Sequence, residues 1–98
     1  MRYDVFIEPR ALADLRQAID YYNTQQRGLG EKFETAIDKH LSLIGQNPFY
    51  QIRYHYIRCL PVKKFPFMIH FFVDEKSKKV FIVSVLHTSK NPDSWMLP

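Results

Sequence analysis

From about residue 10 onwards, the hydrophobic positions of this chain change their period once, near Pro48. Before that point, apolar side chains recur every three or four residues, first from about residue 10 to residue 26 and again from Leu29 to Ile44. This spacing is typical of amphipathic helices. Gly28 and Gly30 separate the two stripes, and Asn47-Pro48 ends the second. Because few residues join them, we expect two helices that form an antiparallel hairpin with one apolar side.

Beyond Pro48 the period becomes two, which indicates strands. Residues 53 to 63 alternate imperfectly, residues 65 to 73 are apolar, residues 74 to 79 are a polar turn, and residues 80 to 86 are apolar again. The alternation of apolar and polar side chains over residues 2 to 8 predicts one further strand. Segment 80 to 86 is apolar on both faces and suits an inner strand. After Pro66, alternate residues are expected to face the core (Phe67, Ile69, Phe71, Val73), and the others to face away (Met68, His70, Phe72).

These elements predict a single α+β domain over residues 1–98. Its order is an N-terminal strand, an antiparallel helical hairpin and a mainly antiparallel three-strand meander, with the helices packed on one face of the sheet. A chain of 98 residues has no room for a second core. Short loops make the later pairings antiparallel, whereas the first strand could add in either direction.

Several classes of protein are excluded by composition. Cys59 is the only cysteine, so it cannot form an internal disulfide, and no paired His/Cys spacing predicts a zinc site. We expect Cys59 to be a small buried side chain, and we expect no metal and no cofactor. The N-terminal residues lack the apolar region of a signal peptide, and no run approaches the ~20 apolar residues of a membrane span. The sequence therefore predicts a cytosolic protein that has no membrane partner.

Charge is distributed unevenly along the chain. Residues 1–48 hold six Lys/Arg against seven Asp/Glu, a net charge of −1, whereas residues 49–98 hold eight against three, a net charge of +5. This asymmetry favours an anionic partner, either nucleic acid or an acidic protein. The alternative is that the lysines protect an exposed strand edge.

Basic, imidazole and aromatic groups gather at the predicted strand ends. His70 and His87 lie at or near positions that face away from the predicted main core, and histidine exchanges protons near neutral pH. The alternatives are that His70 only hydrogen-bonds under the C-terminal tail and that His87 anchors the following turn. Lys63 and Lys90 are more often solvated than catalytic, and Trp95 suits an anchor that packs the tail against the sheet. The predicted binding residues are Arg53, Tyr54, Arg58, Lys63, Lys64, His70, His87, Lys90 and Trp95.

The run from Tyr50 to Arg58 is a second candidate surface. Aromatic faces stack on unpaired bases, and arginine neutralises phosphate, so this run suits contact with RNA. The alternative is that Tyr54 and Tyr56 alternate with Arg53 and His55 because one face packs and the other is wet. The second interpretation is slightly favoured.

The same order of elements carries a resemblance. With AIDYYN in the first helix, GLGEKFE at the start of the second, KKFPF after Arg58 and HTSKNPDSW at the tail, the chain resembles the RelE/ParE family of toxins from bacterial type II toxin-antitoxin systems. The resemblance covers essentially the whole chain. It implies growth inhibition or plasmid stabilization, and a cognate antitoxin, a short acidic protein that wraps the toxin and blocks its working surface.

The resemblance implies one of two mechanisms. RelE-like members are ribosome-dependent mRNA endonucleases (mRNA interferases) that use no metal, and their strand equivalent to residues 66 to 73 typically carries an arginine that supports catalysis. This chain has Met68 there. ParE-like members inhibit DNA gyrase without a catalytic constellation, and the long hairpin with a degenerate cleft favours that branch.

The first hypothesis is therefore a toxin that acts by binding DNA gyrase. If the chain is instead an endoribonuclease, the resemblance and the charge pattern assign the catalytic residues to His87, Arg58, Lys63 and Lys64. A third alternative is an orphan or decayed toxin that only binds its antitoxin.

Overall fold

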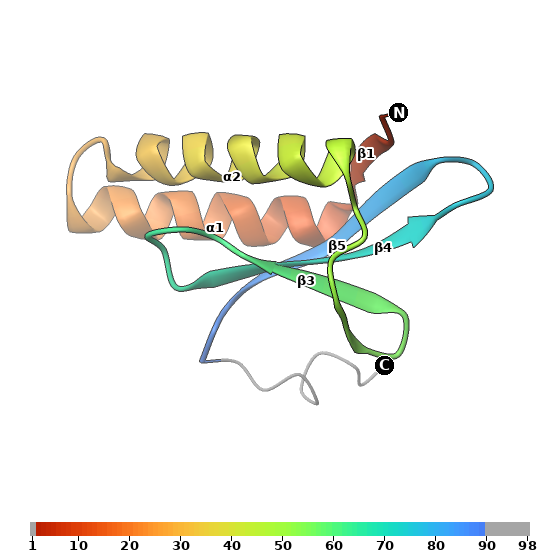
Figure 1. Cartoon of the computed structure of the whole chain (residues 1–98). Helices are drawn as coiled ribbons and strands as arrows, with labels where there is room; N and C mark the ends of the chain where they lie inside the picture. The colour runs from red at the N-terminus through yellow and green to blue at the C-terminus, as the bar shows by residue number, and fades with distance from the viewer. Residues whose placement is uncertain (1, 90–98) are drawn as a thin grey trace.

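Two helices cover one face of a five-stranded sheet in the computed structural model, which describes residues 2–89 (Figure 1). The predicted α+β order is confirmed, but the meander has an additional short strand, because the segment predicted as one strand from residue 53 is divided in two. The elements are β1 (Asp4–Ile7), α1 (Pro9–Gln25), α2 (Leu29–Gln46), β2 (Ile52–Tyr54), β3 (Ile57–Pro61), β4 (Phe67–Asp74) and β5 (Lys79–His87).

The helical hairpin follows from local signals at its ends. Pro9 begins α1, where its fixed φ suits a helix and its missing N–H costs nothing. Gly28 precedes α2 with φ of +85°, a left-handed conformation that glycine adopts without strain. The Asn23 side chain then accepts a hydrogen bond from the Gly30 N–H at 2.8 Å. The C-terminal turn of α1 therefore satisfies one of the free amides that begin α2.

The sheet has the strand order β1-β5-β4-β3-β2. β1 pairs with β5 in parallel, which settles the direction that the sequence left open, and all other neighbours are antiparallel. β5 lies between β1 and β4, as its two apolar faces predicted. β2 and β3 are separated by a tight turn in which His55 has φ of 47°.

A bulge in β5 changes which of its side chains face the helices. His70 pairs with Ser84 while Phe71 pairs with Ile82, so Val83 is an extra residue without an opposite partner on β4. The expectation for His70 is confirmed, since it faces away from the helices. The expectation for His87 was wrong, because the bulge brings it opposite Phe67 on the helical side.

The core lies between the helices and the sheet. Phe33, Ile37 and Ile44 of α2 pack against Ile69 and Phe71 of β4 and against β5, and all are at most 2% exposed. Phe67 and Val73 join this core, so the predicted inward face of β4 is confirmed. Cys59 is buried, as expected. Within residues 2–89, neither helix is long and apolar enough to cross a membrane.

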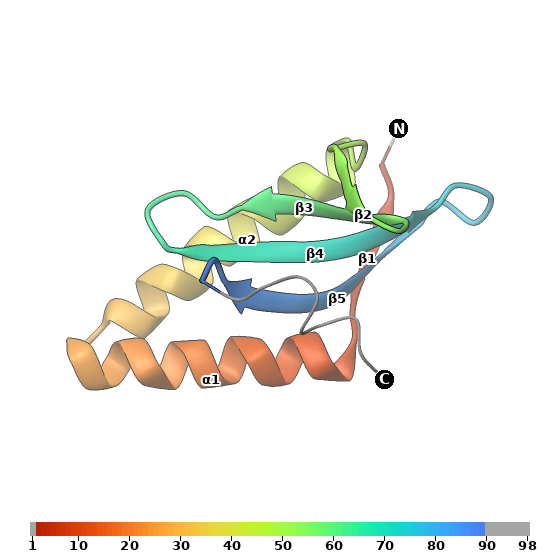
Figure 2. The same cartoon turned by 90° about the horizontal axis from the view of Figure 1, so that it is seen from below.

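α1 takes the place of a strand beside the second half of β5. β1 ends at Ile7, opposite Ile82, and from there α1 runs along the edge of the sheet while α2 crosses behind β3 and β4 (Figure 2). The Asp14 carboxylate of α1 accepts a hydrogen bond from the Val85 N–H at 3.0 Å. A side chain thus satisfies a backbone donor that a neighbouring strand would otherwise pair.

Candidate functional site

The side of the sheet away from the helices, here called the distal face, carries a buried polar cluster. His70 of β4 pairs with Cys59 of β3 and with Ser84 of β5, so three strands place these side chains in one row. His70 has no exposed surface, and Ser84 is 3% exposed. Tyr54 of β2 contacts the row, with its ring tilted by 58° from the plane of the His70 ring and the ring centroids 5.7 Å apart.

Both neighbours of His70 approach the same ring nitrogen. The Tyr54 hydroxyl lies 2.9 Å from His70 Nδ1, and the Cys59 thiol lies 3.3 Å from it. Burial, together with the positive charges of Arg10 and Arg53, lowers the pKa of His70 to about 4. Burial also raises the pKa of Tyr54 to about 12 and the pKa of Cys59 to about 11. At neutral pH the hydroxyl and the thiol are therefore protonated and the imidazole is neutral, and the single lone pair of an unprotonated Nδ1 accepts from one of the two groups at a time.

These protonation states limit the chemistry of the cluster. A general base works best when its pKa lies near the operating pH, and an imidazole with a pKa of about 4 is a weak base at pH 7. A thiol with a pKa of about 11 is hardly ionised there and is a poor nucleophile. The arrangement rigidifies the distal face and suits binding better than proton transfer.

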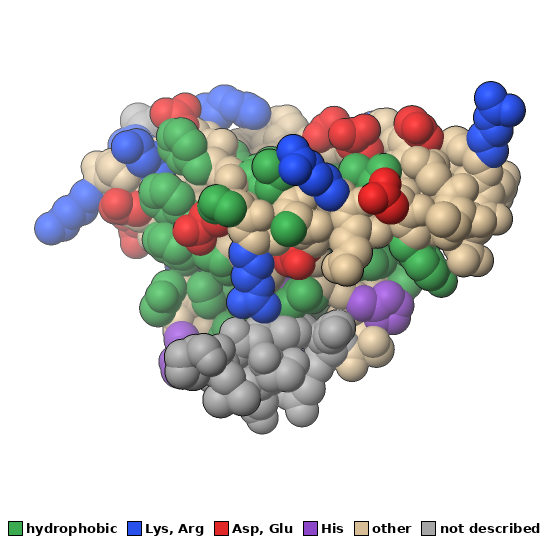
Figure 3. Space-filling model, turned by 180° about the vertical axis from the view of Figure 1, so that it is seen from behind, with side chains coloured by type: hydrophobic (Ala, Val, Ile, Leu, Met, Phe, Trp, Pro, Cys, Tyr) green, Lys and Arg blue, Asp and Glu red, His purple; other side chains and the backbone are tan. Residues whose placement is uncertain are grey.

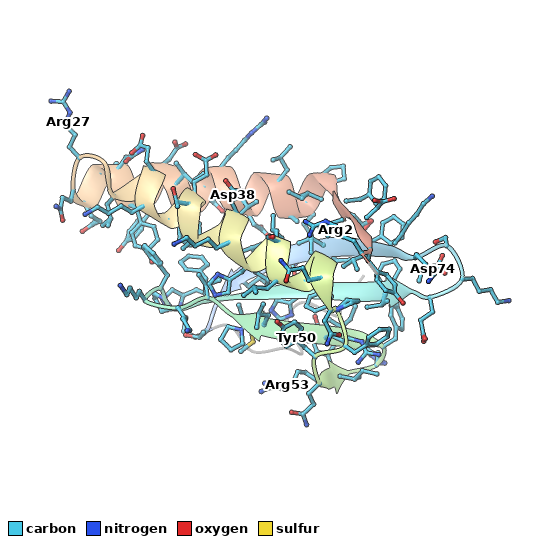
Figure 4. The ribbon with its side chains drawn as sticks, turned by 45° about the horizontal axis from the view of Figure 1, so that its top comes forward. Arg2, Arg27, Asp38, Tyr50, Arg53 and Asp74 are labelled. Atoms are coloured by element: carbon cyan, nitrogen blue, oxygen red, sulfur yellow. The ribbon has the colours of Figure 1, made fainter. Side chains whose placement is uncertain are left out.

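A cavity of about 270 Å³ lies beside this cluster, lined by Arg10, Tyr54, His55, Tyr56 and Ser84 among others. Arg53 extends from the sheet on the side away from the helices (Figure 4). Arg10 was not predicted as a site residue. It is the second residue of α1. Only the position of α1 beside β5 brings it here, a placement that no spacing in the sequence signals.

His87 lies at a second hollow, a groove of about 750 Å³ between α1 and the ends of β4 and β5. Its ring lies edge-on to Phe67, with centroids 5.4 Å apart. His87 Nδ1 accepts a hydrogen bond from the Ser89 N–H at 3.1 Å and lies 2.8 Å from the Ser89 hydroxyl. The contacts of His87 are therefore those of a residue that anchors the following turn.

Arg58 is occupied with a structural contact. Its guanidinium donates to the Tyr50 carbonyl at 2.7 Å and lies over the Phe49 ring, 5.3 Å from the centroid. Arg58 pairs with Phe71, whereas His87 pairs with Phe67, four residues earlier on β4. At 3.3 Å per residue, the two pairs are about 13 Å apart along the strand. The structure therefore does not bring Arg58 to His87.

Lys63 and Lys64 lie in the turn between β3 and β4. Both are exposed, and the turn borders the helix α2. They lie at the same end of the sheet as His87, the end where β4 begins. The Val62 N–H, just before them in the chain, donates a hydrogen bond to the Phe67 carbonyl, and Phe67 pairs with His87 on β5. Lys90 and Trp95 lie outside the described residues. A catalytic role for Arg58, Lys63, Lys64 or His87 stays a prediction.

The aromatic side chains near β2 pack rather than forming an open platform. Tyr54 contacts His70, and Tyr56, although 66% exposed, lies edge-on to Phe72 with centroids 5.6 Å apart. Phe72 stacks on Phe81, which stacks on Phe6, so one row of rings crosses the distal face. These contacts agree with the packing interpretation of this segment.

Apolar side chains are exposed among charged ones on the back of the molecule, and most acidic side chains visible there lie over the helical half (Figure 3).

Among residues 2–89, no group of three or more His, Cys, Asp or Glu side chains is placed to hold a metal ion.

Solved structures share this fold. A chain of the chromosomal ParDE system from P. aeruginosa superposes with a TM-score of 0.77 at 19% identity, over 88% of this chain and 96% of that one. The RelBE2 complex from Mycobacterium tuberculosis gives 0.65 at 15% identity, over 89% and 99%. The intact E. coli RelBE complex gives 0.65 at 18% identity, over 85% and 93%. The fold is that of the RelE/ParE toxins.

The family follows from the sequence. The model of the ParE toxin of type II toxin-antitoxin systems, parDE, matches residues 5–92, nearly the whole chain. The protein therefore belongs to the ParE toxin family. No curated protein matches this sequence.

Proposed function

We propose that this toxin acts by binding DNA gyrase, and that a cognate antitoxin, a short acidic protein, neutralises it. The proposal places the protein in the cytoplasm, where gyrase and the antitoxin would meet it. It rests on the composition of the distal face, where, among residues 2–89, the row of Pro61, Met68 and Leu86 presents no cation.

The observation that carries the proposal is the row around Met68. Met68 pairs with Pro61 on β3 and with Leu86 on β5, so three apolar residues cross the distal face where RelE-like toxins are expected to hold an arginine. Phosphate transfer needs cations aimed at the developing charge. A row of Pro, Met and Leu supplies none, and it suits contact with a protein surface.

The state of His70 supports the same proposal. His70 is the histidine nearest this row on the distal face, and its pKa of about 4 leaves it neutral and weakly basic at pH 7. The toxin-antitoxin complexes among the similar structures support an antitoxin partner, and the ParDE match supports the gyrase branch.

A supercoiling assay tests the proposal. Purified toxin should inhibit supercoiling of relaxed plasmid by gyrase, and induction in cells should trigger the DNA damage response. Met68→Ala, which shortens the apolar row, should weaken inhibition, whereas the exposed control Lys76→Ala on the β4–β5 turn should not. Unchanged supercoiling at saturating toxin would exclude gyrase as the target.

A ribosome-dependent endoribonuclease is the second candidate, because Lys63, Lys64 and His87 lie at one end of the sheet. This mechanism requires transcripts that are cut on translating ribosomes after induction and remain intact with His87→Ala. Sequencing RNA shortly after induction distinguishes the two candidates, since binding to gyrase leaves messages uncut.

A further inference from the structure

The cavity of about 270 Å³ on the distal face has the dimensions of a site for a small molecule. Arg10 of α1 lines it, as do His55 and Tyr56 of the β2–β3 turn, and the sheet contributes Ile57 and Val83. A water molecule occupies about 30 Å³ in the liquid, so the cavity has room for roughly nine water-sized groups. That space fits a single ring with one head group attached.

Ser84 places a buried hydroxyl at this cavity. Its side chain is 3% exposed and lines the cavity from β5. Within residues 2–89, the hydroxyl makes no hydrogen bond to another side chain or to the backbone. Buried hydroxyls are nearly always hydrogen-bonded, because losing water without gaining a partner is costly. The Ser84 hydroxyl is therefore available as a hydrogen-bond donor to a bound molecule.

The Arg10 side of the cavity carries positive charge. The first turn of α1, residues 9–12, contains no acidic residue, and the positive end of the helix dipole disfavours a cation there. Within residues 2–89, Arg10 forms no ion pair, either with Glu8 or with Asp14 one turn later. Arg53 forms none either, and both arginines lie close enough to His70 to lower its pKa. This charge favours an anion.

Aromatic rings line the side of the cavity that faces the β2–β3 turn. Tyr54, His55 and Tyr56 follow one another there, and the rings of Tyr54 and His55 have centroids 6.3 Å apart. Tyr56 is 66% exposed and meets Phe72 in a T-shaped contact, so much of its ring stays accessible. Such rings suit contact with a flat apolar body.

We propose that this cavity binds a small aromatic oxyanion, a flat ring that carries a carboxylate or a phosphate group. The Arg10 guanidinium would pair with two oxygens of the head group, and the ring would lie against Tyr56. The Glu8 N–H donates to the Ile82 carbonyl at 2.9 Å. Arg10 and Ser84 each lie two residues beyond that contact, so one head group can reach both. The inference goes beyond the proposed function, since it holds whether the target is gyrase or the ribosome.

The surroundings favour a small molecule over a nucleic-acid strand. Surfaces that bind single strands continue their cations along several successive nucleotides. Along the strands, the apolar row around Met68 lies to one side of the cavity. On the other side Lys79 lies between Asp4 and Asp74, which are its partners on the neighbouring strands. The positive charge at the cavity is therefore local and matches a single anionic group.

Titration of nitrogen-15-labelled full-length protein, followed by amide NMR shifts, tests the inference. The probes are benzoate, phenyl phosphate, inorganic phosphate and benzamide, the neutral counterpart of benzoate, at constant ionic strength. Benzoate or phenyl phosphate should shift the amides of His55, Val83 and Ser84 saturably. Benzamide and inorganic phosphate should bind at least about fivefold more weakly, because each lacks either the charge or the ring. Tighter binding of phenyl phosphate assigns the site to phosphorylated ring compounds such as nucleotides, and tighter binding of benzoate assigns it to aromatic acids.

Two variants and a matched control complete the test. Arg10→Gln should weaken binding roughly ten- to hundredfold, because the head group loses charge-assisted hydrogen bonds. Ser84→Ala should weaken it roughly two- to tenfold while circular dichroism shows an unchanged fold. Arg16→Gln removes an exposed charge elsewhere on α1 and should leave the affinity unchanged. Equal affinities of Arg10→Gln and the wild type, equal responses to benzamide and benzoate, or no saturable shift at the cavity would overturn the inference.

Discussion

The imidazole of His40 joins the helical layer to the sheet through the backbone of Lys63. His40 is 7% exposed, and its Nε2 accepts the Lys63 N–H at 3.2 Å. Its Nδ1 lies 2.6 Å from the Ala36 carbonyl one helical turn earlier, so Nδ1 carries the hydrogen and Nε2 is left to accept. One neutral tautomer therefore serves both contacts.

His40→Leu should destabilise the protein by about 1–3 kcal/mol, because the Lys63 N–H loses its acceptor at a half-buried position. Urea unfolding followed by circular dichroism measures the change. Lys39→Leu, at an exposed position of the same helix, should alter stability by at most about 0.5 kcal/mol. Equal effects of the two substitutions would show that the His40 bond contributes little.

Asp14→Ala should also destabilise the fold, by about 1.5–3 kcal/mol, because the Val85 N–H loses a charged acceptor at the edge of the sheet. Asp14→Asn should cost less, since its side-chain oxygen can still accept. Asp20→Ala, on an exposed position of the same helix, serves as the control. Amide hydrogen exchange should locate the loss at Val85, and unchanged protection there would contradict the prediction.

The helices could be predicted closely because their signals are local. The expected helix from about residue 10 to 26 is observed as Pro9–Gln25, and the second spans Leu29–Gln46 as its stripe indicated. Glycine, proline and a period of 3.6 are sufficient for such boundaries. The break between β2 and β3 was missed, because the turn uses His55 with φ of 47° where glycine or asparagine would have signalled it.

The candidate site was harder to predict because it depends on pairing between distant segments. Segment 80–86 is apolar on both faces, so nothing in it shows that Val83 is a bulge that moves His87 to the helical side. The approach of Arg10 to His70 depends on the position of α1 beside β5, which is a tertiary property. The sequence did identify His70 and Tyr54, whose contact the structure places on the distal face.

Gly30 and Asn23 should be energetically coupled. A Cβ at Gly30 would lie 2.6–2.7 Å from the Asn23 side chain, which would have to move and release the Gly30 N–H. Gly30→Ala should therefore stabilise an Asn23→Ala background by about 0.5–1 kcal/mol through helix propensity, and should fail to stabilise the wild type. A double-mutant cycle measured by thermal unfolding should give a coupling of about 1 kcal/mol. Strict additivity would contradict this geometry.

The stability of the protein should depend on pH through His70. Its folded pKa of about 4 lies below the ordinary 6.5, because burial and the nearby Arg10 and Arg53 disfavour the charged ring. As the pH falls below about 6.5, the unfolded chain gains a proton that the folded protein does not, so the free energy of unfolding declines. The decline should end near pH 4 and total on the order of 3 kcal/mol.

His70→Phe tests this dependence, because phenylalanine fills the site without titrating. The variant can be less stable at pH 7.5, since it loses the contacts with Tyr54 and Cys59. Its free energy of unfolding should nevertheless change less than that of the wild type between pH 7 and about 4.5, and His55→Gln, at an exposed turn, should keep the wild-type slope. Parallel slopes for wild type and His70→Phe in urea titrations would show that His70 is not held neutral by the fold.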